Sequence, residues 1–136
     1  MLVSLVIIFA LTVFCIWPRP DARFTGKWQA FQGNATTSVA VLDLRRDGTG
    51  QTNFSDGSPP DEYFWSGTSR HFTTSLKAQP TFTRLLAQII KPLWFSLTGR
   101  ELYFGSRLVL VKSVSRDEIK LESPDGAVLT YRRVSE

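Results

Sequence analysis

The sequence is poor in the side chains on which most enzymes depend. It has one cysteine, Cys15, and one histidine, His71, among 136 residues. A lone cysteine excludes a disulfide within the chain and any zinc site built from several cysteines. A lone histidine excludes the paired-histidine motifs of metalloenzymes. We therefore expect no bound metal, no cofactor and no enzymatic activity.

An excess of charge of one sign is also missing. Sixteen Lys and Arg residues stand against twelve Asp and Glu, which gives a net charge of +4 and an isoelectric point near 9.6. This mildly basic balance is too small to indicate a partner made of nucleic acid. The chain is instead rich in apolar residues, at 43%, with ten Phe, four Trp and three Tyr. That composition is typical of one globular domain and argues against disorder.

The first strong pattern is an uncharged apolar run that starts at Leu2 and covers residues 2–17 (LVSLVIIFALTVFCIW). As a helix it would extend about 24 Å, slightly less than the ~30 Å hydrocarbon core of a bilayer. No Lys or Arg precedes the run, and bulky residues stand where a cleavage site would need small ones. The pattern therefore favours an uncleaved membrane anchor over a signal peptide. Trp17 stands where an interfacial aromatic belongs, and Pro18 would end the helix.

The orientation of this anchor stays open. Arg19, Arg23 and Lys27 all follow the span, so the positive-inside rule would place the following domain in the cytoplasm. Bacterial proteins with one N-terminal span and a small β-domain usually export that domain, and we expect an extracytoplasmic location. A cleaved signal would instead give a secreted protein. The expected organisation is a transmembrane or signal segment over residues 1–17, a linker over 18–23 and a β-domain over 24–136.

Most of the remaining chain has the pattern of a small β-domain. Short β-prone runs alternate with turn residues about every 8 to 12 positions. The turn at Asp47-Gly48 is the clearest, because glycine supplies the positive φ that a tight hairpin needs. The expected strands cover residues 24–31, 37–45, 49–54, 63–65, 71–76, 107–114, 119–122 and 127–134. About eight strands predict a mainly-β fold, an antiparallel up-and-down barrel or a strongly curved sheet, and barrel closure would remove exposed edges.

One segment departs from the β pattern. Residues 81–94 (TFTRLLAQIIKPLW) place apolar side chains at helical spacing. We expect one inserted helix of about two to three turns, its length limited by Pro92. It would plug the barrel or pack on the sheet. The alternatives are a lid over the barrel mouth and an amphipathic helix on a bilayer, with Arg84 and Lys91 extending their charges to the surface.

Three short motifs, taken in order, point to a known family. They are Gly-x-Trp over residues 26–28, the hairpin LDLRRDGTG over 42–50, and Asp-Gly-x-x-Leu-x-Tyr-Arg-Arg over 125–133. Together they resemble the small bacterial lipocalin-like domains of the calycin type, over roughly residues 24–134. The resemblance implies a structural contact at the barrel floor. In it, Trp28 packs against an arginine of the last strand, Arg132 or Arg133, as a cation–π pair.

The resemblance also implies a function. Members of this family bind apolar small molecules in the cup, or have no assigned ligand. An aromatic interior and mouth would suit such a guest, with Phe54, Phe64, Trp65, Phe72, Trp94 and Phe104 as the candidate lining residues. The same side chains would equally fill the core of a barrel of this size.

Two functions therefore stay open. The first is a membrane-anchored, non-enzymatic domain that binds an apolar or amphipathic small molecule, a lipid or an envelope partner. The second is a structural or interaction module with a filled core and no ligand. Neither function involves nucleic acid or metal, and both attach to the membrane through residues 2–17.

The single histidine and the basic residues indicate no catalytic site. His71 lies near Ser69 and Ser75, but a catalytic triad also needs an orienting carboxylate at the same place. We interpret it as a partly exposed strand residue. The arginines are scattered over turns and strand ends, which is typical of a solvated surface. The alternative is a basic rim that meets anionic lipid headgroups close to the anchor.

Overall fold

The computed structural model describes residues 2–16, 21–33, 35–78, 81–102 and 106–135. Within these ranges the chain forms eight strands, two α-helices and one short 3-10 helix. The helices are α1 (Leu2–Ile16), η1 (Ala22–Phe24) and α2 (Thr81–Thr98). The strands are β1 (Gly26–Gln32), β2 (Ala40–Leu44), β3 (Thr49–Phe54), β4 (Asp61–Gly67), β5 (His71–Leu76), β6 (Ser106–Val114), β7 (Glu118–Glu122) and β8 (Val128–Arg133).

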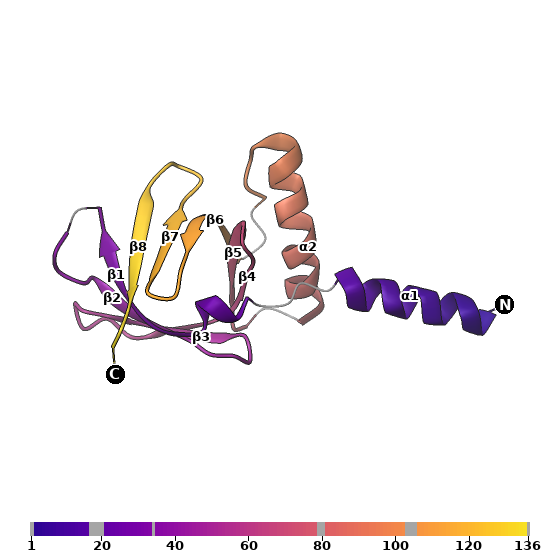
Figure 1. Ribbon diagram of the computed structural model, residues 1–136, viewed down its shortest axis with the longest axis horizontal. Helices are drawn as coiled ribbons and strands as arrows, with labels where there is room; N and C mark the ends of the chain where they lie inside the picture. Colours follow the sequence, from indigo (N-terminus) through magenta and orange to yellow (C-terminus); the bar gives the residue numbers. More distant parts are fainter. Residues whose placement is uncertain (1, 17–20, 34, 79–80, 103–105, 136) are drawn as a thin grey trace.

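The eight strands close into an antiparallel up-and-down barrel (Figure 1). Each strand pairs with its neighbours in sequence, and β1 also pairs with β8 in a register that sets Trp28 opposite Arg133. A closed barrel satisfies the backbone hydrogen bonds of both terminal strands, which an open sheet would leave exposed. Closure confirms the predicted barrel and decides against the open curved sheet. Strands β3 and β5 match their predicted ranges, and the other six differ only at their ends.

Local turn chemistry sets the register of the β2–β3 hairpin. The carboxylate of Asp47 accepts hydrogen bonds from the backbone N and the Oγ1 of Thr49, at 2.9 and 2.6 Å. Gly48 takes the left-handed conformation, with φ +84°. Trp65 on β4 then fastens the hairpin, because its Nε1 donates to the carbonyl oxygens of Arg45 and Thr49. The Asp47-Gly48 turn predicted from the sequence is therefore confirmed.

The core lies at the end of the barrel where η1 enters. Its buried members are Phe24, Trp28, Leu44, Trp65, Phe72, Ile119 and Leu121. Phe24 comes from η1 rather than from a strand, and its ring stacks on that of Phe72 at a centroid distance of 5.3 Å. Gly67 allows this approach, since a Cβ there would lie 2.8 Å from the Phe24 ring. The 3-10 turn thus closes one end of the barrel with an aromatic side chain.

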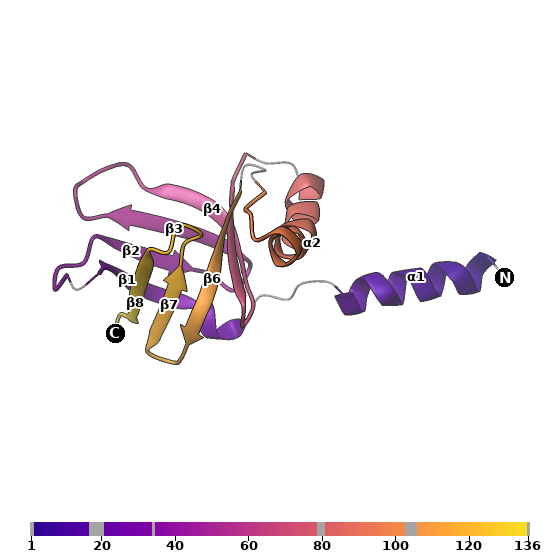
Figure 2. The ribbon, with the colours of Figure 1, turned by 90° about the horizontal axis from the view of Figure 1, so that it is seen from above.

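Helix α2 packs against the outside of the barrel, over β5 and β6 (Figure 2). Ala87 and Lys91 on the packed face are buried, and the Lys91 ammonium donates to the carbonyl oxygen of Ser106. The Arg84 guanidinium lies 3.7 Å from the centre of the Phe64 ring on β4. The helix is therefore neither a plug nor a lid.

Two expectations about this helix were wrong. It continues through Pro92 to Thr98 instead of ending near Trp94. A proline inside a helix removes one backbone hydrogen bond, and packing on the barrel outweighs that loss. Lys91 does not reach the surface but turns its charge inward, because a backbone carbonyl is available at the start of β6.

The N-terminal run forms a separate apolar helix. Helix α1 spans fifteen residues, without charge, and the side chains described in it are exposed. Over the residues that the structure describes, no helix is both long and apolar enough to cross a membrane. The predicted membrane-spanning helix is thus not seen. Trp17 and Pro18, the expected interfacial aromatic and helix stop, lie outside the described residues.

Candidate functional site

The barrel floor is built around Trp28. Its side chain is fully buried, and its Nε1 donates a 2.7 Å hydrogen bond to the carbonyl oxygen of Phe24. The Cζ of Arg133 lies 4.2 Å from the centre of the indole ring. Arg132 points the other way, with its Cζ 5.1 Å from the ring of Phe31. Of the two arginines that the family resemblance offered as partners of Trp28, it is Arg133 that makes the contact.

Arg133 also ties the last strand to the start of the barrel. Its guanidinium donates to the carbonyl oxygens of Thr25 and Arg23, at 3.0 and 3.2 Å. Its Nε donates to the carbonyl oxygen of Arg116 at 2.5 Å. Gly26 leaves room for the guanidinium, because a Cβ at that position would collide with it. The Gly-x-Trp motif and the final arginine therefore form one structural unit.

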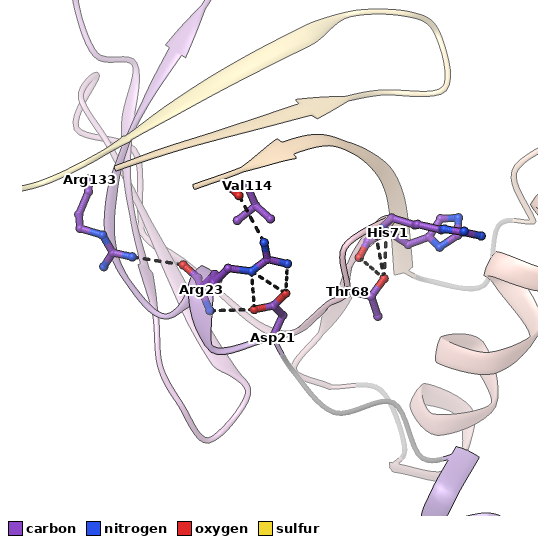
Figure 3. A network of polar contacts seen from close by, with 7 residues as sticks. Asp21, Arg23, Thr68, His71, Val114 and Arg133 are labelled. Carbon is purple, nitrogen blue, oxygen red and sulfur yellow. Dashed lines mark hydrogen bonds and ion pairs between the residues drawn. The ribbon is translucent and has the colours of Figure 1, made fainter. Parts of the chain in front are cut away.

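A second polar cluster holds η1 in place (Figure 3). The backbone N of Asp21 donates to the carbonyl oxygen of Gly67, at 2.8 Å. Its carboxylate accepts from the backbone N and the guanidinium of Arg23, and that guanidinium also reaches the carbonyl oxygen of Val114 at 3.5 Å. The hydrogen bond from Arg23 lowers the pKa of the Asp21 carboxyl. Together these contacts connect Asp21 and Arg23, which precede β1, to the ends of β4 and β6.

Of the described aromatic residues that were predicted to line a ligand cavity, only Trp65 and Phe72 come together, with ring centroids 6.0 Å apart. Trp65 and Phe72 are buried in the core. Phe64 lies on the outside of the barrel, under Arg84. Phe54 and Trp94 are 37% and 43% exposed, Phe54 at the end of β3 and Trp94 on α2. Phe104 lies outside the described residues. The alternation of strand residues separates these side chains, because neighbours in a strand point to opposite faces.

The barrel core itself leaves almost no empty space. A gap of about 10 Å³ remains inside it, large enough for roughly one water molecule. Its lining residues are Phe24, Trp28, Leu42, Leu44, Phe72, Ile119, Leu121 and Tyr131. Burial raises the pKa of the Tyr131 phenol to about 12. Side chains in this core therefore leave no room for an organic guest.

A much larger hollow lies on the outside of the barrel. This outer groove has a volume of about 450 Å³ and runs between the C-terminal half of α2 and strands β5, β6 and β7. Its lining residues are Arg70, His71, Phe95, Ser96, Leu110, Val111, Lys112 and Glu122. This groove could not be predicted from the sequence, because no local pattern shows that α2 packs on the outer face of the sheet. The nearest hint was His71, interpreted as a partly exposed strand residue.

The outer groove combines an apolar wall with a positively charged edge. Lys112 forms an ion pair with Glu122 across β6 and β7, whereas Arg70 forms no ion pair with any described residue. Partial burial lowers the pKa of His71, and the neighbouring Arg70 charge lowers it further. Both effects favour the neutral imidazole, and the backbone N of His71 donates to the Oγ1 of Thr68 at 3.1 Å (Figure 3). Among the described residues that line the groove, Arg70 is thus the cation without an ion pair.

The described residues include no cluster of three or more His, Cys, Asp or Glu that could hold a metal ion. His71, Ser96 and Glu122 all line the groove, and among the described residues no hydrogen bond joins their side chains in the way that a triad requires. The groove offers apolar contact along one wall and a positive charge at one edge.

Comparison with known proteins shows the fold. Neither a protein-family model nor a curated protein matches the sequence. A solved structure of a lipocalin-like protein from Bacteroides uniformis is similar at 15% identity and a TM-score of 0.52, covering 82% of this chain and 99% of its own. An uncharacterized protein from Bacteroides eggerthii is similar at 12% identity and a TM-score of 0.51, with the same coverage of both chains. The chain therefore has an eight-stranded antiparallel barrel similar in fold to that of a lipocalin-like protein, and α2 lies on its outer face.

Proposed function

We propose that this protein is a non-enzymatic, lipocalin-like binding module that takes a small amphipathic molecule in the outer groove. The observation that carries the proposal is the contrast between about 450 Å³ in that groove and about 10 Å³ inside the barrel. Pockets for small molecules have volumes of roughly 300–1,000 Å³. The groove reaches that size, whereas the interior gap is too small for any organic ligand.

The groove residues define the class of ligand. Phe95 and Leu110 offer an apolar wall, while Arg70 offers a guanidinium without a carboxylate partner among the described residues. An arginine of this kind recognises a carboxylate through two parallel hydrogen bonds. A carboxylate with a medium or long alkyl chain fits both features. Its tail would lie against the wall and its head would meet Arg70.

We further propose that α1 holds this module at a membrane, with the β-domain on the extracytoplasmic side. Exposed apolar side chains cover α1, among them Leu5, Ile8 and Leu11. Each costs free energy in water, at about 25 cal/mol for each Å² of apolar surface, and a lipid phase removes that cost. The protein is expected to sediment with membranes and to be released by detergent rather than by salt.

A membrane-impermeant thiol reagent, used on a Cys15→Ser, Thr130→Cys variant in intact cells, tests the orientation.

The single histidine makes the groove directly testable. The protein reconstituted in lipid nanodiscs has one imidazole, that of His71, and its NMR signal reports on the groove. Titration with octanoate is expected to shift this signal saturably. Arg70→Gln is expected to abolish the saturable shift, whereas Arg116→Gln, a change of equal charge outside the groove, is expected to leave it intact.

The filled barrel core favours one other candidate, a structural or interaction module without a small-molecule ligand. In that case the His71 signal would stay in place, or would drift without saturation, and Arg70→Gln would behave as the parent protein. Either result would overturn ligand binding in the groove. It would leave the attachment to a membrane as a separate question.

A further inference from the structure

Helix α2 carries a second apolar surface, which faces away from the barrel. Five large side chains recur at spacings of three and four residues, and together they form what we call the α2 stripe: Phe82, Leu86, Ile89, Leu93 and Leu97. This spacing places them on one face of a helix. The opposite face holds the buried Ala87 and Lys91, which pack on the barrel. The ends of the stripe are the most exposed, with Phe82 at 73% and Leu97 at 75%.

Exposing such an apolar surface to water costs free energy unless a partner covers it. Isolated exposed leucines are ordinary on soluble proteins, but a continuous row along an eighteen-residue helix indicates an interaction surface. The barrel does not use it, because α2 is already anchored through its other face by Lys91 and by Arg84 over Phe64. The covering partner must therefore come from outside the barrel.

The composition of α2 fits a lipid surface. The helix contains Arg84 and Lys91 but no acidic residue, so no negative charge opposes phosphate headgroups. Trp94 lies at the edge of the α2 stripe and is 43% exposed, and tryptophan is favoured at the level of lipid headgroups. Arg100 follows directly after the helix and is exposed. An apolar face with an aromatic at its margin and an exposed cation, Arg100, beyond its end is the pattern of helices that lie in a membrane surface.

The position of α2 relative to the start of the domain supports the same partner. The segment from the end of β4 to the start of β5 contacts both the start of the domain and the groove beside α2. The carbonyl oxygen of Gly67 accepts a hydrogen bond from the backbone N of Asp21, and Arg70 lines the groove together with Phe95 of α2. Ile16, the last residue of α1, precedes Asp21 by five peptide units, which span at most about 18 Å when fully extended. The chain that follows α1 therefore enters the barrel at the end of β4, three residues before Arg70 at the groove beside α2.

We propose that the α2 stripe lies against the same bilayer that takes up α1, so that the domain rests on the lipid surface through two apolar helices. This inference rests on the membrane attachment proposed above. The α2 stripe would sit at the boundary between headgroups and acyl chains, with the barrel on the aqueous side of α2. The lipid surface would then cover the apolar row that the barrel leaves exposed.

Depth measurements on the full chain test this arrangement. In a Cys15→Ser background, nitroxide labels are placed one at a time through Leu93→Cys on the stripe, Phe9→Cys on α1 and Lys120→Cys on the outside of β7. The protein is reconstituted in vesicles of phosphatidylcholine and phosphatidylglycerol. Collision with oxygen, which enters lipid, is compared with collision with a water-soluble nickel complex. The Leu93 and Phe9 labels are expected to meet oxygen and avoid nickel, and the Lys120 label is expected to show the reverse.

The three labels separate the two proposals. If the Leu93 label meets nickel as readily as the Lys120 label while the Phe9 label avoids it, the stripe inference fails and the membrane attachment stands. If the Phe9 label also meets nickel, the membrane attachment itself fails. If the Leu93 label avoids both reagents, protein covers the stripe. A second copy of the chain would then replace the bilayer as its partner, which would also overturn the inference.

Discussion

Arg133 covers the indole ring of Trp28, with its Cζ 4.2 Å from the ring centre, at the seam where the last strand meets the first. The same guanidinium bonds the carbonyl oxygens of Thr25 and Arg23, about one hundred residues earlier in the chain. A single side chain therefore joins the end of β8 to β1 and to the segment that closes the barrel floor. Stability of the closed barrel should depend strongly on this residue and weakly on its neighbour.

Arg133→Met is expected to destabilise the protein by about 2–4 kcal/mol. The change removes a cation–π contact and leaves several carbonyl oxygens without their donor. Arg132→Met removes the same charge from the adjacent residue, whose contact with Phe31 is on the outside, and should cost less than about 1 kcal/mol. Urea unfolding of both variants measures the difference. Equal losses of stability would show that the contacts of Arg133 contribute nothing to the free energy of unfolding beyond the effect of its charge.

Trp28→Ala is expected to cost about 3–5 kcal/mol, because it opens a large cavity in a fully buried site. It also leaves the carbonyl oxygen of Phe24 without the indole donor. Trp28→Phe keeps most of the ring volume and loses the hydrogen bond, so it should cost less. Thermal melts followed by circular dichroism give both values. A melt unchanged by Trp28→Ala would show that this residue does not hold the barrel floor.

Gly67→Ala is expected to destabilise the protein by about 1–3 kcal/mol through overpacking. The added Cβ would lie 2.8 Å from the ring of Phe24, which is fully buried and has no room to move. Phe24→Leu removes the ring edge that the new methyl group meets. In the double variant the cost of Gly67→Ala should largely disappear. A double-mutant cycle with additive losses would show that Phe24 does not lie over Gly67.

The features that depend on local chemistry could be read from the sequence. The turn at Asp47-Gly48 and the strands β3 and β5 follow from residues within a few positions of one another. The choice between Arg132 and Arg133 could not be made in that way. It depends on the register of β8 against β1, since adjacent residues of a strand face opposite sides of the sheet.

The candidate site was harder to predict from the sequence than the fold. Whether aromatic side chains line a cavity or fill it is decided by how closely they pack, and in this barrel Phe24 takes up the space. That residue was expected to begin the first strand, and no local pattern shows that η1 folds over the barrel end instead. The groove depends on α2 packing outside the sheet. This packing also lets the helix continue past Pro92.

The buried phenol of Tyr131 makes the stability of the barrel depend on pH in the alkaline range. Its pKa is raised to about 12, chiefly by burial and further by the nearby Tyr63. An unfolded chain would release this proton near pH 10, so between about pH 10 and 12 the unfolded state binds fewer protons than the folded one. Stability therefore falls as the pH rises through this window. The total loss is about 3 kcal/mol, since one pKa unit corresponds to 1.36 kcal/mol.

Tyr131→Phe is expected to remove this alkaline loss, because the variant has no proton to release at that position. Urea unfolding at a series of pH values should show the parent protein losing stability relative to the variant only above about pH 10. Phenolate absorbance of the folded parent should contain a late step near pH 12 that is missing in Tyr131→Phe. Tyr63→Phe is the matched control. Burial also raises the pKa of Tyr63, while its hydrogen bond with Thr52 opposes that rise. The Tyr63→Phe variant should therefore keep the absorbance step near pH 12. If the phenolate absorbance of the parent protein were instead complete near pH 10, water would reach Tyr131 inside the barrel.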